Sequence, residues 1–156
     1  MKEYKISGLK KTTKIKTLGI GVFDGLHIGH QKIADKCSHI LTFYPHPDLV
    51  LSKNKKLKML TTLREMRFYL PRLLVQHFTK KTALLSPISF LEEVLAKLNP
   101  KKIVVGYDFH FGCGKLGNTQ TLKEWAAQKN IVVECLDPVS YNKIVIKSSK
   151  IRTFIE

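Results

Sequence analysis

The stretch "GIGVFDGLHIGHQ", from Gly19 to Gln31, decides how the fold of this chain is interpreted. Its first residues are apolar and end at the turn pair Asp24-Gly25, which is typical of a buried strand followed by a tight turn. Two histidines, His27 and His30, then flank Gly29 at the start of a segment with helical spacing. A strand that passes through a polar turn into a helix indicates an α/β fold, and such folds bind ligands at this kind of turn.

Outward from this stretch, apolar runs and helical patterns alternate along the chain. The sequence predicts strands at residues 16–23, 39–44, 72–78, 101–109, 131–136 and 143–148. It predicts helices at residues 28–37, 61–70, 86–99, 121–130 and 149–156, and a lysine-rich loop at 48–60. Glu65 stands where it completes a capping box with Thr61 or Thr62, and Ser86-Pro87 is a typical helix start. The alternation predicts an α/β fold with a mainly parallel sheet covered by helices, in one domain over residues 1–156.

Composition narrows the possible partners and the compartment. The chain carries 27 lysines and arginines against 12 acidic residues, a formal net charge of +15, which indicates an anionic partner. Arginine is scarce, whereas proteins that read DNA bases tend to use arginine forks. No apolar run is long enough to span a bilayer. The three cysteines form no C-x-x-C pair and no disulfide framework, which favours a reducing cytoplasm.

The histidine pair is the strongest candidate for chemistry. Gly25 and Gly29 permit close approach of the backbone, and the following helix offers its N-terminal amides to a phosphate group. Two imidazoles there can donate hydrogen bonds to phosphate oxygens, more strongly when they are protonated. Zinc is the rival use of two histidines, but it needs more convergent ligands, and Cys37 falls outside ligand spacing. A purely structural pair, with one ring exposed and one packed, fits the glycine-flanked turn less well.

Four ordered segments carry a resemblance that covers nearly the whole chain. "HIGH" at His27–His30 matches the H-x-G-H signature of the nucleotidyltransferase superfamily. The surrounding "GVFDGLHIGHQ" resembles the FMN adenylyltransferase (FAD synthetase) module of bacterial bifunctional riboflavin kinase/FAD synthetases. Further motifs of that family resemble "LTFYPHP" at Leu41–Pro47, "VVGYDFHFGCGKLGN" at Val104–Asn118 and "SSKIR" at Ser148–Arg152. The resemblance implies a Rossmann-like, three-layer α/β/α nucleotidyltransferase fold.

The resemblance also implies a reaction and a set of site residues. The reaction is transfer of AMP from ATP to FMN, giving FAD and pyrophosphate by in-line displacement without a covalent nucleophile. The catalytic residues implied are His27, His30 and Arg152. ATP binding is implied for these three and for Gly21, Val22, Phe23, Asp24, Gly25, Gly106, Ser148 and Ser149. Flavin binding is implied for Phe43, Pro45, His46, Pro47, Asp108, Phe109 and Phe111.

Some assignments stay open at this point. Mg²⁺ is expected to bridge phosphate oxygens of the substrates, with no dedicated metal site in the protein. Asp24 is either an outer ligand of that ion or a turn residue that binds backbone amides. Phe109 and Phe111 either stack on a substrate ring or pack in the core, and Trp125 is expected in the core.

The chain departs from the family pattern at several positions. Val22 stands where asparagine is frequent, His110 where lysine or arginine is usual, and Lys147 and Ser149 where the last motif has serine and threonine. The segment between Leu70 and Ser86 is short. Residues for the family's C-terminal riboflavin kinase domain are absent, so the chain either performs adenylylation alone or is a module of a longer enzyme.

Two alternatives to FMN adenylylation remain. One is a related nucleotidyltransferase with another phosphate acceptor, and the other is a degenerate basic relative that binds nucleotide or RNA without turnover. We expect a cytoplasmic monomer that acts on ATP and FMN, with neither a membrane nor a nucleic acid as partner.

Overall fold

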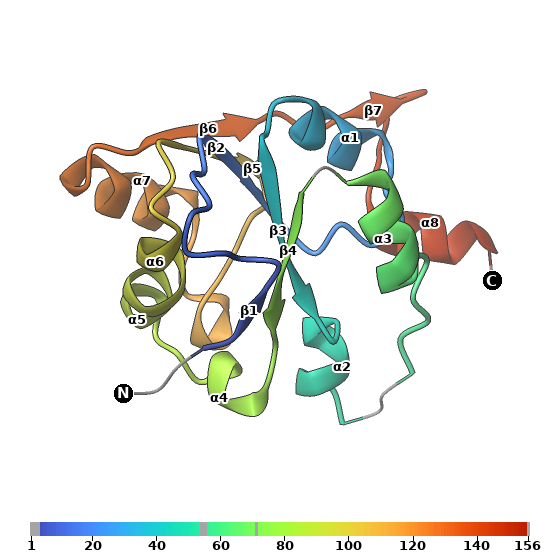
Figure 1. Cartoon of the computed structure of the whole chain (residues 1–156). Helices are drawn as coiled ribbons and strands as arrows, with labels where there is room; N and C mark the ends of the chain where they lie inside the picture. The colour runs from blue at the N-terminus through green and yellow to red at the C-terminus, as the bar shows by residue number, and fades with distance from the viewer. Residues whose placement is uncertain (1–3, 54–55, 71, 156) are drawn as a thin grey trace.

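A parallel sheet forms the centre of the structure, a computed structural model that describes residues 4–53, 56–70 and 72–155. In these ranges the strands form a six-stranded sheet, in the order β1-β4-β3-β2-β5-β6, and a separate hairpin, β7-β8 (Figure 1). All pairings in the large sheet are parallel except that of β1 with β4. Its strands are β1 (Ile6–Ser7), β2 (Thr17–Ile20), β3 (His39–Tyr44), β4 (Leu73–His77), β5 (Lys102–Gly106) and β6 (Val132–Leu136).

One face of the sheet is covered by α1 (Ile28–Asp35) and α3 (Leu63–Tyr69). Here Ile33 of α1 and Met66 of α3 pack against Ile40 and Val104 of the strands. Thr62 caps α3 and forms the predicted capping box with Glu65. This face also holds the strand-to-helix turn that the sequence singled out.

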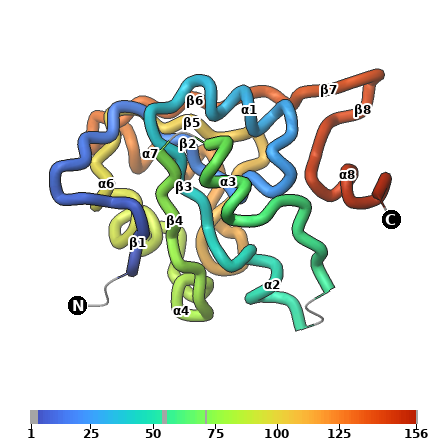
Figure 2. Tube along the Cα trace, turned by 45° about the vertical axis from the view of Figure 1, so that its right-hand side comes forward, coloured from blue at the N-terminus to red at the C-terminus, as the bar shows by residue number. Residues whose placement is uncertain are grey.

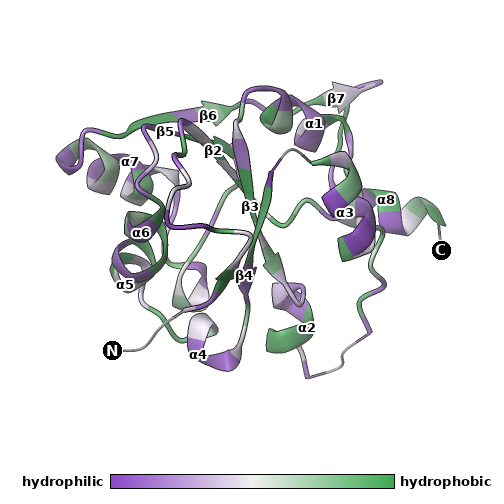
Figure 3. Cartoon of the chain, in the orientation of Figure 1, coloured by the Kyte–Doolittle hydropathy of each residue, from purple (hydrophilic) through white to green (hydrophobic). Residues whose placement is uncertain are grey.

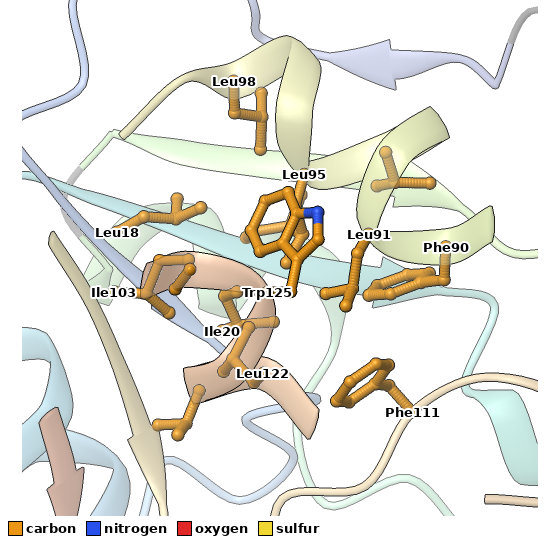
Figure 4. Packing of buried hydrophobic residues seen from close by; sticks show 14 of the residues in the cluster. Leu18, Ile20, Phe90, Leu91, Leu95, Leu98, Ile103, Phe111, Leu122 and Trp125 are labelled. Atoms are coloured by element: carbon orange, nitrogen blue, oxygen red, sulfur yellow. The ribbon is translucent and has the colours of Figure 1, made fainter. Parts of the chain in front are cut away.

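The opposite face carries the larger core. It is covered by α7 (Thr119–Gln128) and by a continuous segment of α5 (Pro87–Phe90), η1 (Leu91–Leu95) and α6 (Ala96–Leu98). Trp125 of α7 packs there as predicted, together with Leu91, Leu95 and Ile103 (Figure 4). The helices carry hydrophilic and hydrophobic residues on different sides, as expected for amphipathic helices (Figure 3). Helices on both faces confirm the predicted three-layer α/β/α fold.

Four features of the fold differ from the sequence prediction. The first long strand ends at Ile20 rather than at Phe23, because the backbone of Phe23 has a φ of 57° and leaves the sheet. The predicted loop 48–60 begins with a helix, α2 (Pro47–Leu51), which the Nδ1 atom of His46 caps. The expected strand at 143–148 joins the small hairpin instead of the sheet. The sequence also did not predict β1, α4 (Lys80–Ala83), the 3₁₀ helix η2 (Cys113–Lys115) and β7 (Ser140–Tyr141).

The C-terminal segment returns to the face of α1. After the hairpin of β7 (Ser140–Tyr141) and β8 (Ile144–Val145), helix α8 (Ser148–Ile155) lies on the side of the molecule away from α6 and α7 (Figures 1 and 2). Residues 54 and 55 of the predicted loop and residue 156 of the last predicted helix lie outside the described residues. Within the described ranges, no helix combines the length and apolar character needed to cross a membrane.

Candidate active site

A cleft with a volume of about 670 Å³ opens at the carboxyl ends of β2, β3 and β5. In the strand order, β3 lies beside β2 toward one edge of the sheet, whereas β5 and β6 follow β2 toward the other edge. Ligands of doubly wound α/β folds bind where the strand order reverses in this way. The cleft is lined by residues that follow each of the three strands, among them Gly21–Asp24, His46–Asp48 and Asp108–Gly112.

The two histidines of the turn are stacked on each other. Their ring centres lie 3.5 Å apart and the ring planes differ by 19°. The Nδ1 atom of His27 caps α1 by accepting a hydrogen bond of 3.3 Å from the backbone N–H of His30. A Cβ atom at Gly29 would lie 3.0 Å from Cε1 of His27, so the His27 ring would have to shift by a few tenths of an ångström to accommodate a larger residue there.

Burial keeps both rings neutral at pH 7. Burial lowers the pKa of His27. The pKa of His30 is lowered to about 3, mainly by burial and by a smaller amount by the neighbouring His27. Because Nδ1 of neutral His27 accepts a hydrogen bond, its proton is on Nε2, which is free to donate. The Nδ1 atom of His30 is buried and has no hydrogen-bond partner among the described residues. His30, which lines the cleft, and His27, which stacks on it, are therefore available as neutral hydrogen-bond donors rather than as cations.

We expect His30 to stay neutral across the physiological pH range in the folded protein. Its folded pKa of about 3 lies below the ordinary value of 6.5. As the pH falls, the unfolded state therefore takes up a proton on this ring before the folded state does. This residue therefore destabilises the fold progressively as the pH falls below 6.5, and contributes no pH dependence above it. NMR titration of the histidine ring protons checks the pKa directly. A His30 resonance that titrates near 6.5 would contradict the buried, neutral ring, and the His30→Asn variant should flatten the decline of unfolding free energy with falling pH.

Asp24 joins three segments of the chain below the histidine pair. Its Oδ1 atom accepts hydrogen bonds from the backbone N–H groups of Leu60 and Thr61, both at 2.9 Å, and from the Thr61 hydroxyl. Its Oδ2 atom pairs with the guanidinium of Arg152. Its backbone carbonyl accepts a hydrogen bond of 2.6 Å from the hydroxyl of Ser148. Of the two roles left open for Asp24, the geometry matches the residue that binds backbone amides, since both carboxylate oxygens are engaged.

The N-terminal turn of α8 is thereby attached to the site. Arg152 also donates from Nε to the backbone carbonyl of Lys58 at 3.0 Å, and its side chain is largely buried. The guanidinium expected to meet a polyphosphate is thus paired with Asp24 in this structure. Ser148 lines the cleft, whereas Ser149 is exposed and outside the lining.

The other end of the cleft is aromatic. Phe43, His46, Pro47, Phe109 and Phe111 of the predicted flavin side all line it. Asp108, which was predicted with them, lines the cleft as well, and its charge acts on His27. Phe111 is buried and stacks on Phe109 at 5.5 Å between ring centres, so these two rings both pack together and face the cleft. Pro45 lies instead at a smaller groove beside α2.

Most of the predicted nucleotide residues meet at the same cleft. Gly21, Val22, Phe23, Asp24, His30 and Gly106 line it. Gly25, His27 and Arg152 are outside the lining. His27 stacks on His30 and Arg152 binds Asp24, two residues that line the cleft. The Gly25 N–H donates to Thr61, which is itself outside the lining.

Sequence reasoning missed one wall of the cleft. That wall comes from α2, from the segment around α4 and from α5, through Leu51, Phe78, Thr82, Ala83 and Phe90. No motif marks these residues, because they reach the cleft only when the helices fold over the sheet. Lys115, from the glycine-rich loop, also lines the cleft and was not singled out.

A zinc site finds no support among the residues that the structure describes. In these ranges no three histidine, cysteine, aspartate or glutamate side chains gather closely enough to hold a metal ion. The histidine pair has therefore no third protein ligand of this kind in the described part of the chain.

The parallel sheet, the H-x-G-H turn at its reversal point and the cleft above that turn define a Rossmann-like α/β fold of the nucleotidyltransferase type. Comparison with known proteins specifies the family. The FAD synthetase family profile matches residues 9–150, and the chain belongs to this family.

Individual relatives agree with this membership. A bifunctional riboflavin kinase/FMN adenylyltransferase of Buchnera aphidicola subsp. Schizaphis graminum is 36% identical, over 94% of this chain and 53% of its own length. An FAD synthetase of Listeria monocytogenes is 34% identical, over 93% of this chain and 65% of its own. The chain thus spans between about half and two thirds of the length of these relatives.

A solved structure supports the fold. The crystal structure of a macrolide-efflux protein from Streptococcus pneumoniae superposes with a TM-score of 0.78 at 25% identity. The superposition covers 92% of this chain and 52% of that protein.

Proposed function

We propose that this chain transfers AMP from ATP to FMN, giving FAD and pyrophosphate. The observation that carries the proposal is one cleft with a stacked histidine pair at one end and an aromatic wall at the other, in a member of the FAD synthetase family. An enzyme that joins a nucleotide to a phosphorylated aromatic ring needs a phosphate-binding end and a ring-binding end within reach of each other. Relatives whose names include FMN adenylyltransferase agree with this substrate pair.

The reaction requires positioning rather than a covalent intermediate. A phosphate oxygen of FMN attacks the α-phosphorus of ATP, a new P–O bond forms, and the bond to the β-phosphate breaks as pyrophosphate leaves. We assign His27 and His30 to the α- and β-phosphate oxygens, where their N–H groups stabilise developing negative charge. A neutral ring can fill this role because neutral imidazole keeps one N–H group that donates a hydrogen bond.

The remaining assignments follow from the neighbours of the histidine pair. Ser148 and the amides at the start of α8 are suited to the β- and γ-phosphates. Arg152 binds these phosphates when their oxygens displace it from Asp24. Without them, its pairing with Asp24 holds α8 against the histidine turn. Gly21, Val22 and Gly106 border the nucleotide. Phe43, His46, Phe109 and Phe111 border the flavin, with Phe78 and Phe90 added by the tertiary structure.

We propose that Mg²⁺ accompanies ATP as part of the substrate, held by phosphate oxygens and water. Both oxygens of Asp24 already have partners, so this carboxylate is not a free ligand for the ion. When bound, Mg²⁺ neutralises phosphate charge, and the protein side chains orient the phosphates around it. A monomeric state and a cytoplasmic location stay predictions.

Incubation of the protein with ATP, Mg²⁺ and FMN, followed by chromatography, tests the proposal. We expect FAD and pyrophosphate in equal amounts. Product from pantetheine phosphate, nicotinamide mononucleotide or glycerol phosphate in place of FMN would reassign the acceptor. A salt-dependent gel shift with RNA, without pyrophosphate release from any acceptor, would favour the degenerate binding protein instead.

We also expect the 156 residues of this chain to leave riboflavin unphosphorylated while they adenylylate FMN. The described residues build one sheet core, and the cleft described above belongs to it. The measurement is the same assay with riboflavin and ATP, and accumulation of FMN would contradict the prediction.

A further inference from the structure

Free positive charge is scarce at the histidine pair, although the net charge of the chain is +15. Burial lowers the pKa of His27 and of His30, so neither ring is charged at pH 7. The guanidinium of Arg152 pairs with Asp24, and the carboxylate cancels its charge. A nucleoside triphosphate brings several negative charges into the cleft, so the site needs a cation beyond these side chains.

Lys147 offers such a cation at the rim of the cleft. It directly precedes Ser148, which lines the cleft and is bonded to Asp24. Its Nζ atom lies 3.9 Å from Oδ2 of Asp108 and 5.4 Å from the centre of the Tyr107 ring. Asp108 also lines the cleft, and its charge opposes the effect of burial on the pKa of His27. Lys147 therefore stands at the end of the cleft that holds the histidine pair.

The contacts of Lys147 are loose enough to be exchanged. Its side chain is 42% exposed and that of Asp108 is 56% exposed, so water screens their attraction. The flexible four-carbon stem lets the ammonium turn from Asp108 to an arriving anion without breaking a buried contact. Lys115 also lines the cleft, and its charge acts on His46.

We propose that Lys147 is a further substrate-binding residue, whose ammonium contacts the polyphosphate of a nucleoside triphosphate held at the histidine pair. This inference rests on the proposed function, from which it takes ATP as the ligand of the cleft. It adds to the site a lysine at a position where the family pattern has serine. When the triphosphate binds, Lys147 exchanges Asp108 for phosphate oxygens. A nucleoside monophosphate lacks the outer phosphates and gains nothing from this lysine.

Calorimetric binding of ATP and AMP to the wild type and to Lys147→Ser tests the inference without relying on turnover. For the serine variant we expect the Kd of ATP to rise about tenfold, the size of one charge-assisted contact, and the Kd of AMP to stay unchanged. Lys147→Arg should bind ATP within about threefold of the wild type because it keeps the charge. Lys150→Ser, at an exposed position one turn along α8, removes the same charge and should bind both nucleotides like the wild type.

The outcomes separate this inference from its rivals. Equal weakening of ATP and AMP would make Lys147 a residue that only positions Asp108, and would overturn the inference. Equal ATP affinity in Lys147→Ser and Lys150→Ser would reduce the role to general surface charge, and would also overturn it. A wild type that binds ATP but forms no FAD would refute the proposed function while the Lys147 comparison still stands. Melting temperatures of the variants verify that all of them are folded.

Discussion

Replacing His27 or His30 by alanine is expected to slow FAD formation by at least about 100-fold while the protein stays folded. Each ring supplies a donor to oxygens that gain charge in the transition state, and removal of one such donor typically costs two or more orders of magnitude in rate. The rings stack at 3.5 Å, so loss of one also removes the support that orients the other. The measurement is the initial rate of FAD formation at saturating ATP and FMN.

A matched control separates catalysis from folding. His77 is exposed at the end of β4, and His77→Ala should retain wild-type activity. His30→Asn keeps a side-chain N–H and should recover part of the rate that His30→Ala loses. Near-normal turnover in both single alanine variants, with unchanged melting temperatures, would refute the assignment of the histidine pair.

The Asp24→Ala variant is expected to lose about 3–5 kcal/mol of unfolding free energy, the usual cost of removing one partner of a buried ion pair. The Asp24 carboxylate is buried and the Arg152 side chain nearly so, which leaves the guanidinium uncompensated. The N–H groups of Leu60 and Thr61 lose their acceptor as well. Denaturant unfolding measures the loss, and hydrogen exchange should increase at residues 60–61 and 148–155.

Two further variants locate the effect. Asp24→Asn keeps an acceptor for the two amides but loses the charge, so its destabilisation should lie between the wild type and Asp24→Ala. Asp35→Ala removes a carboxylate at the exposed end of α1 and should change stability by no more than about 0.5 kcal/mol. A stability of Asp24→Ala within about 1 kcal/mol of the wild type would show that the Arg152 pair and the amide bonds are not what fastens α8 to the turn.

The sequence alone was sufficient for features that depend on near neighbours. Strand β3 covers His39–Tyr44 as predicted, because an apolar run that meets two prolines has few other conformations. The start of α3 at Thr62 follows from a capping box closed within three residues. The histidine turn was located by its glycines and by the strand before it, since the geometry of a strand-to-helix connection is local. The resemblance to FAD synthetases added the expected substrates, which the family match supports.

Only the tertiary structure decided how distant segments complete the site. Asp24 and Arg152 are 128 positions apart, and nothing in either local pattern indicates that they pair. The aromatic end acquired Phe78 and Phe90 because helices pack over the sheet, and packing depends on the shape of the whole core rather than on a motif. The end of β2 at Ile20 likewise depends on Phe23, whose ring is buried between sheet and helices while its backbone turns out of the strand. Local physics determined which residues form each element and turn, and long-range packing determined which of them face one another.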